Sequence, residues 1–270
     1  MAATTALRRI AAGALAVTLI AAAVVVTIVL RHHAAATPSC QVSVGTDSYT
    51  LDIDQAASAT TIAAVGKRLG LPDHAVTVAL AAALQESHLH NLPYGDRDSL
   101  GLFQQRPSQG WGTAAQILTP SYAAGAFFHA LTRVTDWEAL PITDAAQQVQ
   151  RSGAPTAYAR WEPEARTLAI AMTGEARAGL SCRFSLARSH DPAPAVTASL
   201  GTELGVSSLD AVFAAPRGWT IASWLVGHAQ QFRVTTVSFD DQEWRASTGH
   251  WRPATPTANR VLFSQQAATT

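Results

Sequence analysis

The sequence has little charge, a single lysine and only two cysteines. Charged residues make up 14% of its 270 residues, the formal net charge is zero and Lys67 is the only lysine. No stretch gathers arginine and lysine into a basic surface, which argues against non-specific binding to nucleic acid. No cluster of cysteines supports a zinc site, and Ser87 lacks the Gly-x-Ser-x-Gly setting of a serine hydrolase.

Residues 10–30 form one uncharged stretch that is long enough to cross a membrane. At a rise of about 1.5 Å per residue, a helix of roughly 20 residues spans a hydrocarbon core of about 30 Å. Arg8 and Arg9 favour a cytoplasmic N-terminus with the remainder exported, although Arg31 weakens this asymmetry. A cleaved signal peptide is the alternative, but its apolar region is normally about 7–15 residues. We therefore expect an uncleaved signal anchor and a single-pass plasma-membrane protein whose bulk is extracytoplasmic.

Cys40 and Cys182 both lie on the expected exported side, where thiols can oxidise. A single pair has a single connectivity, so we predict a disulfide bond between them. It would close a loop of about 140 residues and stabilise the fold by roughly 4–5 kcal/mol in the chain-entropy model. Two buried free thiols are the alternative.

Proline- and alanine-rich segments divide the sequence. One precedes Cys40, and another, Asp191-Pro-Ala-Pro, follows Cys182. We expect an N-terminal stub and anchor at residues 1–36, a first domain at 37–185, a Pro/Ala linker at 186–196 and a C-terminal domain at 197–270.

The periodicity of apolar residues changes along the first domain. Residues 42–53 alternate as a strand or hairpin does, and residues 54–69 have helical spacing that Gly70 is placed to end. Further helices are predicted at residues 122–134, 144–151 and 162–172. In the C-terminal domain, a helical pattern around Trp219 followed by alternating residues 232–239 predicts a small α+β unit.

Glu86 is the clearest candidate for a catalytic residue. It follows an alanine-rich apolar run at residues 76–84 that has the length and composition of a buried helix. A carboxylate at the end of such a helix is unfavourable to keep ionised, so it can hold a proton and donate it to a leaving oxygen, as a glycosidase acid does. The alternative is a structural carboxylate paired with Arg97 or Arg106.

The stretch that begins at Glu86 resembles the active-site segment of lytic transglycosylases and goose-type lysozymes. Glu86 and Ser87 are followed by about a dozen loop-like residues and then by Ser-Leu-Gly-Leu-Phe-Gln at residues 99–104, where the family has Ser-x-Gly-Leu-Met-Gln. The resemblance covers about residues 60–172 and is close over residues 79–105. It implies a mainly α, lysozyme-like domain, here preceded by one transmembrane helix and followed by the small α+β domain.

The resemblance also implies an activity. Such an enzyme cleaves peptidoglycan between N-acetylmuramic acid and N-acetylglucosamine without a cofactor, with Glu86 as general acid and base. In transglycosylases the muramyl 6-hydroxyl attacks internally and no second carboxylate is required. A muramidase of inverting type would instead hold Asp96 or Asp98 roughly 6.5–9.5 Å from Glu86, with water between them. Each aspartate taken singly is equally typical of a turn.

Five residues in or near the motif are candidate substrate ligands: Asp98, Ser99, Gly101, Gln104 and Trp111. Ser99 and Gln104 can donate and accept hydrogen bonds with sugar hydroxyls. Gly101 permits close approach of substrate or of the Glu86 helix. Trp111 can stack on a sugar face. The alternatives are that Ser99 caps a short helix over residues 100–105 and that Trp111 is a core residue.

The resemblance continues to Gly125 and then ends. A proline-led helix at Pro120 carries Gly125, where the family has a glycine at a close packing contact. The next helix usually contains Ala-Tyr-Asn, whose tyrosine lines the cleft near the acid, but residues 146–153 here read Ala-Gln-Gln-Val-Gln-Arg-Ser-Gly. A glutamine or a residue from elsewhere must take the place of that tyrosine, or the reaction is slower.

Two functions from different classes remain. The first is a membrane-anchored peptidoglycan glycosidase, a lytic transglycosylase rather than a hydrolase. The second is a lysozyme-like module that binds peptidoglycan, or a partner in cell-wall synthesis, without cleaving it. A metal site at His88 and His90 is not expected, because the pair lacks the i, i+4 spacing of a zinc-binding helix. Membrane transport is disfavoured, since one span without ionisable residues offers no pathway.

The C-terminal segment resembles a small domain of exported actinobacterial cell-wall proteins. The resemblance rests on Gly218-Trp219, Ala-x-Trp-Leu-Val ending at Val226, and Trp244. A role in binding the wall is one interpretation of its tryptophans, and a purely structural role in a core is the other.

Overall fold

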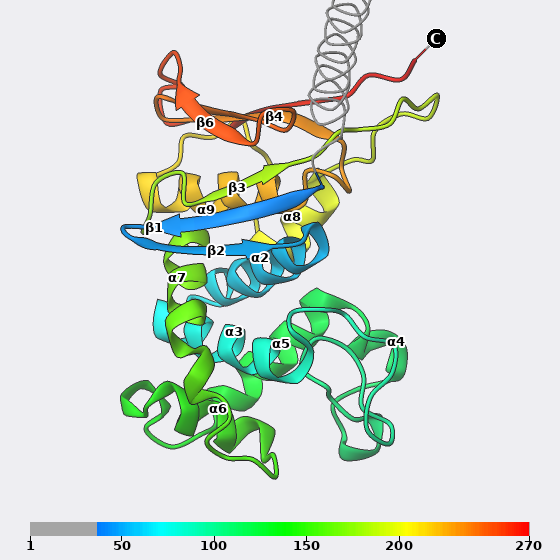
Figure 1. The fold of residues 1–270 in the computed structure, drawn as a ribbon, viewed down its shortest axis with the longest axis vertical. Coiled ribbons are helices and arrows are strands. Elements are labelled where there is room, and N and C mark those ends of the chain that lie inside the picture. The colour runs from blue at the N-terminus through cyan, green and yellow to red at the C-terminus, as the bar shows by residue number, and fades with distance from the viewer. Residues whose placement is uncertain (1–36, 270) are drawn as a thin grey trace, which may run out of the picture. The chain divides into compact units, whose positions relative to one another are not determined.

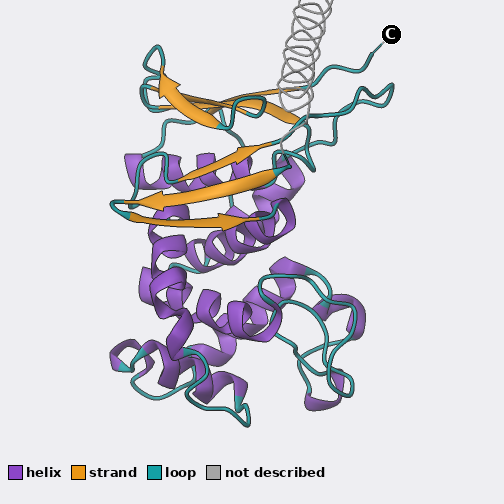
Figure 2. Cartoon of the chain, in the orientation of Figure 1, coloured by secondary structure: helices purple, strands orange, loops and turns teal. Residues whose placement is uncertain are grey.

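The structure, a computed structural model, describes residues 37–269, and the expected membrane anchor at residues 10–30 lies outside them. Within the described part of the chain, no helix is both long and apolar enough to cross a bilayer. Residues from Pro38 onward pack into one unit with a continuous core. Strands gather in one half of this unit, and the other half consists of helices and loops (Figure 2).

A three-stranded antiparallel sheet joins the two ends of the expected first domain. Strands β1 (Ser39–Val44) and β2 (Asp47–Leu51) form a hairpin, and β3 (Leu180–Arg183) pairs with the other edge of β1 to give the order β2-β1-β3. Cys40 lies opposite Cys182 in the register of β1 and β3, and the two are joined by a disulfide bond. The predicted pairing is therefore confirmed.

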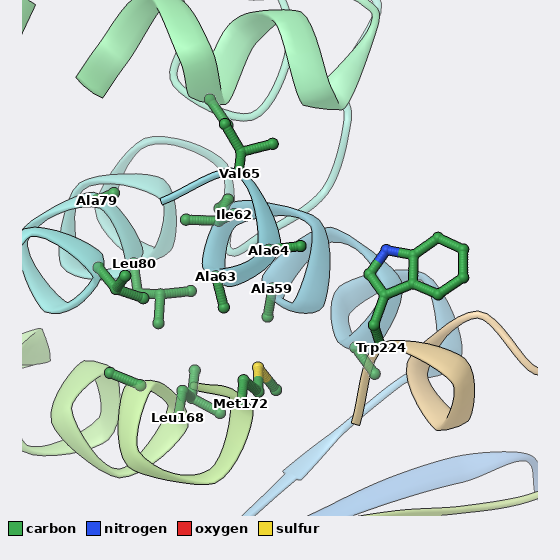
Figure 3. Close-up of a cluster of buried hydrophobic side chains, with 14 of the residues drawn as sticks. Ala59, Ile62, Ala63, Ala64, Val65, Ala79, Leu80, Leu168, Met172 and Trp224 are labelled. Atoms are coloured by element: carbon green, nitrogen blue, oxygen red, sulfur yellow. The ribbon is translucent and has the colours of Figure 1, made fainter. Parts of the chain in front are cut away.

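Helix α2 (Ile53–Arg68) is the centre of the helical core. It begins at a capping box in which the Asp52 side chain accepts from the Gln55 backbone N–H and the Gln55 side chain accepts from the Asp52 backbone N–H. Its alanines let neighbouring helices approach closely, and a Cβ added at Gly66 would lie 2.9 Å from Val76. Figure 3 shows side chains of α2 directed toward Leu168 and Met172.

Among the helices that pack against α2 are α3 (Asp73–Ser87), which carries Glu86, α5 (Pro120–Leu131) and α7 (Glu162–Met172). The connecting segments contain α4 (Ala114–Ile117), α6 (Ile142–Gln150) and the short 3-10 helices η1 (Pro107–Gln109), η2 (Trp137–Ala139) and η3 (Ala159–Trp161). Gly125 lies within α5, where an added Cβ would meet no atom within 4 Å. The close glycine contact expected there is not present.

The C-terminal third contributes two helices and a second antiparallel sheet. The helices are α8 (Thr197–Leu204) and α9 (Ala215–Gly227). The strands are β4 (Val234–Phe239), β5 (Gln242–Arg245), β6 (His250–Pro253) and β7 (Leu262–Gln265), in the order β6-β5-β4-β7. In Figure 1, α9 lies between this sheet and α2, and it contacts both.

The predicted fold class, a mainly α lysozyme-like domain followed by a small α+β domain, is wrong. The described chain has a mixed α/β fold with two antiparallel sheets. Helix α9 packs on α2, and the indole N–H groups of Trp244 and Trp251 donate to the carbonyls of Cys182 and Leu180 in the first sheet. The apolar faces of the C-terminal elements are therefore buried against the N-terminal half of the same core. Periodicity indicates which residues are apolar, but not which distant element covers them.

Candidate functional site

Glu86 lies one residue before the end of α3, and the backbone around it is fixed. The chain leaves the helix through His88 and Leu89, both in the left-handed region with φ of 51° and 63°. Their N–H groups donate to the carbonyls of Leu84 and Ala83, which closes the last turn of the helix. The Gln55 side chain then donates to the His88 carbonyl at 2.9 Å. The half-buried Glu86 side chain is thus presented from a rigid base.

Tyr158 is the immediate partner of Glu86. Its side chain is buried, and its hydroxyl donates to Oε1 of Glu86 at 2.7 Å. Burial raises the pKa of Tyr158, the Glu86 carboxylate raises it further, and the Ser152 hydroxyl partly offsets both effects. The phenol therefore keeps its proton at neutral pH and acts as a donor to Glu86.

Neither arginine that was considered as a partner is paired with Glu86. Arg97 lies beside Asp96, with 3.9 Å between Nε and Oδ2, and Arg106 pairs with Asp98 at 2.7 Å. Across residues 37–269, Glu86 forms no salt bridge, and its Oε2 accepts no hydrogen bond from another residue. One carboxylate oxygen is thus held by Tyr158, and the other remains available to a ligand.

Asp98 holds its own loop together. One oxygen accepts from Arg106 Nε at 2.7 Å, and the other accepts from the Ser108 backbone N–H at 2.8 Å. Hydrogen bonds from Ser108, together with the Arg106 guanidinium, keep the pKa of Asp98 well below its usual range. Asp96 differs, since its side chain is 92% exposed. Neither aspartate has the environment of a base held close to Glu86.

The segment at residues 99–104 is hydrogen-bonded to the end of α3 through Ser87. The Ser87 hydroxyl donates to the Leu102 carbonyl at 2.7 Å. Gly101 has φ of 75°, and a Cβ there would lie 2.7 Å from the Ile117 carbonyl oxygen, so its close contact is with Ile117. The Gln104 side chain donates to the carbonyls of Gly101 and Tyr94, at 3.2 and 3.3 Å. These interactions stabilise the loop.

Ser99 is buried. The residues after it form a turn that is closed by an isolated antiparallel bridge between Leu100 and Gln105. There is no helix over residues 100–105, so Ser99 does not cap one.

The two histidines near Glu86 have separate neighbours. His88 packs edge-on against Trp161, and His90 Nε2 lies 3.7 Å from Asp52.

A cleft of about 830 Å³ opens beside the loop at residues 109–111. Its floor is one face of α5, where the small side chains of Ala126 and Ala130 leave room, and its walls are the loop at residues 109–111 and the end of α6. Trp111 is partly buried and lines the cleft. Glu86 is not among the lining residues.

Gln150 connects the cleft to the Glu86 region. Its side chain lines the cleft and donates to the Phe103 carbonyl at 2.9 Å. Phe103 follows Leu102, which accepts from Ser87, so two hydrogen bonds and one peptide unit link the cleft wall to the residue after Glu86. The cleft and the Glu86–Tyr158 pair therefore belong to one region of the fold.

Sequence reasoning did not identify Tyr158 or Gln150 individually. Tyr158 lies in the segment between α6 and η3, outside the helix in which the family pattern places its tyrosine. One signal was available, because Tyr158 is the only tyrosine after Tyr122. Gln150 lies in the stretch at residues 146–153 from which a glutamine was considered as a replacement.

No family model matches the chain, and comparison with curated proteins likewise found no match.

Proposed function

We propose that this protein is an exported peptidoglycan glycosidase that cleaves between N-acetylmuramic acid and N-acetylglucosamine by transglycosylation. The observation that carries the proposal is the pairing of Glu86 with Tyr158. Tyr158 holds one carboxyl oxygen of Glu86 and no arginine pairs with it, so the other oxygen is free to face a glycosidic oxygen. The uncharged stretch at residues 10–30 and the Cys40–Cys182 disulfide support export.

In the proposed reaction, Glu86 acts first as an acid and then as a base. With Oε1 held by Tyr158, a proton on Oε2 passes to the glycosidic oxygen while the bond from that oxygen to the muramyl anomeric carbon breaks. The muramyl 6-hydroxyl then attacks the anomeric carbon and returns its proton to Glu86. The product is a 1,6-anhydro sugar, no water is consumed, and the enzyme regains its starting protonation state.

The tyrosine assists both steps by fixing the carboxyl group. A phenol that donates to Oε1 stabilises the carboxylate formed after the first transfer. It also keeps the remaining oxygen in one direction, which reduces the entropy lost when a glycan aligns with it. In this proposal Tyr158 takes the role of the tyrosine that the sequence lacks in the expected helix.

Transglycosylation is favoured over hydrolysis by the state of the two aspartates. Inverting hydrolysis needs a carboxylate that activates water opposite the acid. Both oxygens of Asp98 are already bound within its loop, and Asp96 is almost fully exposed beside Arg97. An intramolecular attack by the substrate's own hydroxyl needs neither residue.

Mass spectrometry of digested peptidoglycan tests the proposal. The purified protein is incubated with insoluble peptidoglycan, and the soluble fragments are analysed. Transglycosylation predicts fragments that end in 1,6-anhydro-N-acetylmuramic acid. Reducing ends would show hydrolysis instead, and the absence of soluble fragments under all conditions would contradict a glycosidase.

The second candidate function is glycan binding without cleavage. It is favoured by one observation, that Glu86 does not line the large cleft in this conformation. Sedimentation with insoluble peptidoglycan distinguishes the two functions. A binding module co-sediments equally as wild type and as Glu86→Gln while neither protein releases fragments.

A further inference from the structure

Two adjoining hollows meet at a pair of arginines. The cleft of about 830 Å³ and a second hollow of about 350 Å³ share Arg133, Val134, Gln148 and Arg151 in their walls. The shared wall is formed by the residues that follow α5 and the end of α6. Both arginines therefore border the same open volume, although they come from different elements.

The charged residues that line these two hollows are basic. His129 and the two arginines are the lining residues that can carry a positive charge, and among the described residues no carboxylate lines either hollow. Within residues 37–269, neither Arg133 nor Arg151 forms a salt bridge. Two guanidinium groups without a neutralising partner give this end of the cleft a positive potential.

Hydrogen bonds fix the backbone of both arginines, whose side chains are exposed. Arg133 N–H donates to the Ala130 carbonyl just after α5, and Arg151 N–H donates to the Gln147 carbonyl at the end of α6. Arg151 also has φ of 50°, a conformation that non-glycine residues adopt at some energetic cost. Cations at helix C-termini are stabilised by the helix dipole, which is a structural reason for both positions. That role does not use the guanidinium donors, which make no hydrogen bond to the described residues.

We infer that Arg133 and Arg151 bind a carboxylate carried by the substituent of a muramyl residue. The inference rests on the proposed peptidoglycan substrate and specifies which part of it is recognised. The planar fork of a guanidinium matches the two oxygens of a carboxylate and binds them in pairs. Such a carboxylate is present on the lactyl group of an unsubstituted strand or on the peptide attached to it, whereas oligomers of N-acetylglucosamine carry none.

Arg151 is connected to the Glu86 region through its neighbour Gln150. Arg151 follows Gln150, whose side chain donates to the Phe103 carbonyl. The cleft wall that carries Arg151 is thus joined through Phe103 and Leu102 to Ser87, and in the proposed substrate complex the arginines would meet the substituent of a sugar near the scissile bond. Recognition of that substituent would select strands that contain muramic acid.

Binding to the Glu86→Gln variant tests the inference, because cleavage then does not consume the ligand. Affinities are measured by calorimetry for three ligands of equal sugar count: N-acetylglucosamine oligomers, peptide-free glycan strands and peptide-bearing strands. We expect the carboxylate-bearing ligands to bind about tenfold to hundredfold more tightly than the neutral oligomer. This difference should shrink as salt increases. Preference between the last two ligands identifies the lactyl or the peptide carboxylate.

Substitution of the arginines provides the matched comparison. Arg133→Gln and Arg151→Gln, together in the Glu86→Gln background, should abolish the preference while leaving the affinity for the neutral oligomer unchanged. Arg252→Gln, an exposed arginine in β6, is the control and should retain the preference. Thermal unfolding establishes that each variant is folded.

Equal affinity for neutral and carboxylate-bearing ligands, or a preference that survives loss of both arginines, would overturn the inference. Its failure is separable from failure of the proposed function. Cleavage by wild type with no effect of the arginine substitutions contradicts the inference alone. Arginine-dependent binding without cleavage supports the inference and contradicts the glycosidase.

Discussion

The hydroxyl of Tyr158 lies 2.7 Å from Oε1 of Glu86, although 72 residues separate the two in sequence. Glu86 comes from the end of α3, where Gln55 and Ser87 make hydrogen bonds, whereas Tyr158 comes from the segment after α6. The pair therefore depends on tertiary packing. A buried phenol whose raised pKa keeps it protonated is a persistent donor to that one carboxylate oxygen.

Removal of the Tyr158 hydroxyl should reduce turnover while preserving the fold. Tyr158→Phe retains the buried ring and deletes only the hydrogen bond to Glu86. A hydrogen bond to a charged group contributes about 1.5–3 kcal/mol, which corresponds to a fall in kcat of roughly tenfold to hundredfold. The measurement is the rate of fragment release from peptidoglycan. Tyr94→Phe, at a side chain that is 68% exposed, is the control and should retain the wild-type rate.

Asp98 should make stability depend on pH in the acid range. Its lowered pKa means that the folded state favours the carboxylate, so its contribution is complete above the ordinary pKa of 3.8 and is lost as the pH falls through the lower folded pKa. Asp98→Asn cannot titrate and should show a shallower loss of stability below about pH 4. Denaturant unfolding from pH 7 to pH 2 measures this, with the exposed Asp96→Asn as control. Parallel curves for Asp98→Asn and wild type would contradict the assignment.

The buried His228 should weaken the fold as the solution becomes mildly acidic. Burial lowers the pKa of His228 below its ordinary 6.5, and the nearby Glu203 carboxylate offsets this in part. Below about pH 6.5 the unfolded chain therefore binds a proton that the folded chain resists, and stability falls as the pH decreases. His228→Gln should flatten the free energy of unfolding between about pH 7 and 5. The exposed His250→Gln should leave that slope unchanged.

Two glycines in helices provide a matched test of the packing. A Cβ at Gly218 in α9 would lie 1.9 Å from the Phe239 ring in β4, whereas a Cβ at Gly125 in α5 would meet nothing within 4 Å. Gly218→Ala should destabilise the protein by about 1–3 kcal/mol through overpacking. Gly125→Ala should stabilise it by up to about 1 kcal/mol, because alanine is the better helix former. The midpoints of denaturant unfolding distinguish these signs.

Local pattern was sufficient to predict several elements of the fold. The alternation after Cys40 predicted the β1–β2 hairpin region, helical spacing predicted α2 with its end near Gly70, and the cysteine count predicted the disulfide. Each of these depends on neighbouring residues or, for the disulfide, on there being one possible partner. The structure confirms them because no choice among distant partners was involved.

The predicted fold class was wrong because it depended on which distant surface covers the apolar faces of the C-terminal elements. The apolar face of α9 and the rings of Trp224 and Trp244 are buried, but the sequence does not specify which surface covers them. They pack against the N-terminal half and extend its core. The same reasoning applies to Tyr158, whose position beside Glu86 is set by the path of the segment after α6. The roles of Gly101 and Gln104 within the loop likewise depend on contacts that spacing alone does not contain.

The central claim is that Glu86 is the proton donor and acceptor of a transglycosylation. The most direct measurement compares wild type and Glu86→Gln on the same peptidoglycan, with fragments quantified by mass spectrometry and the fold checked by thermal unfolding. We predict that wild type releases fragments with 1,6-anhydro ends, and that the folded Glu86→Gln variant releases at least about a hundredfold fewer. Release of the same anhydro fragments at an undiminished rate by folded Glu86→Gln would contradict the claim.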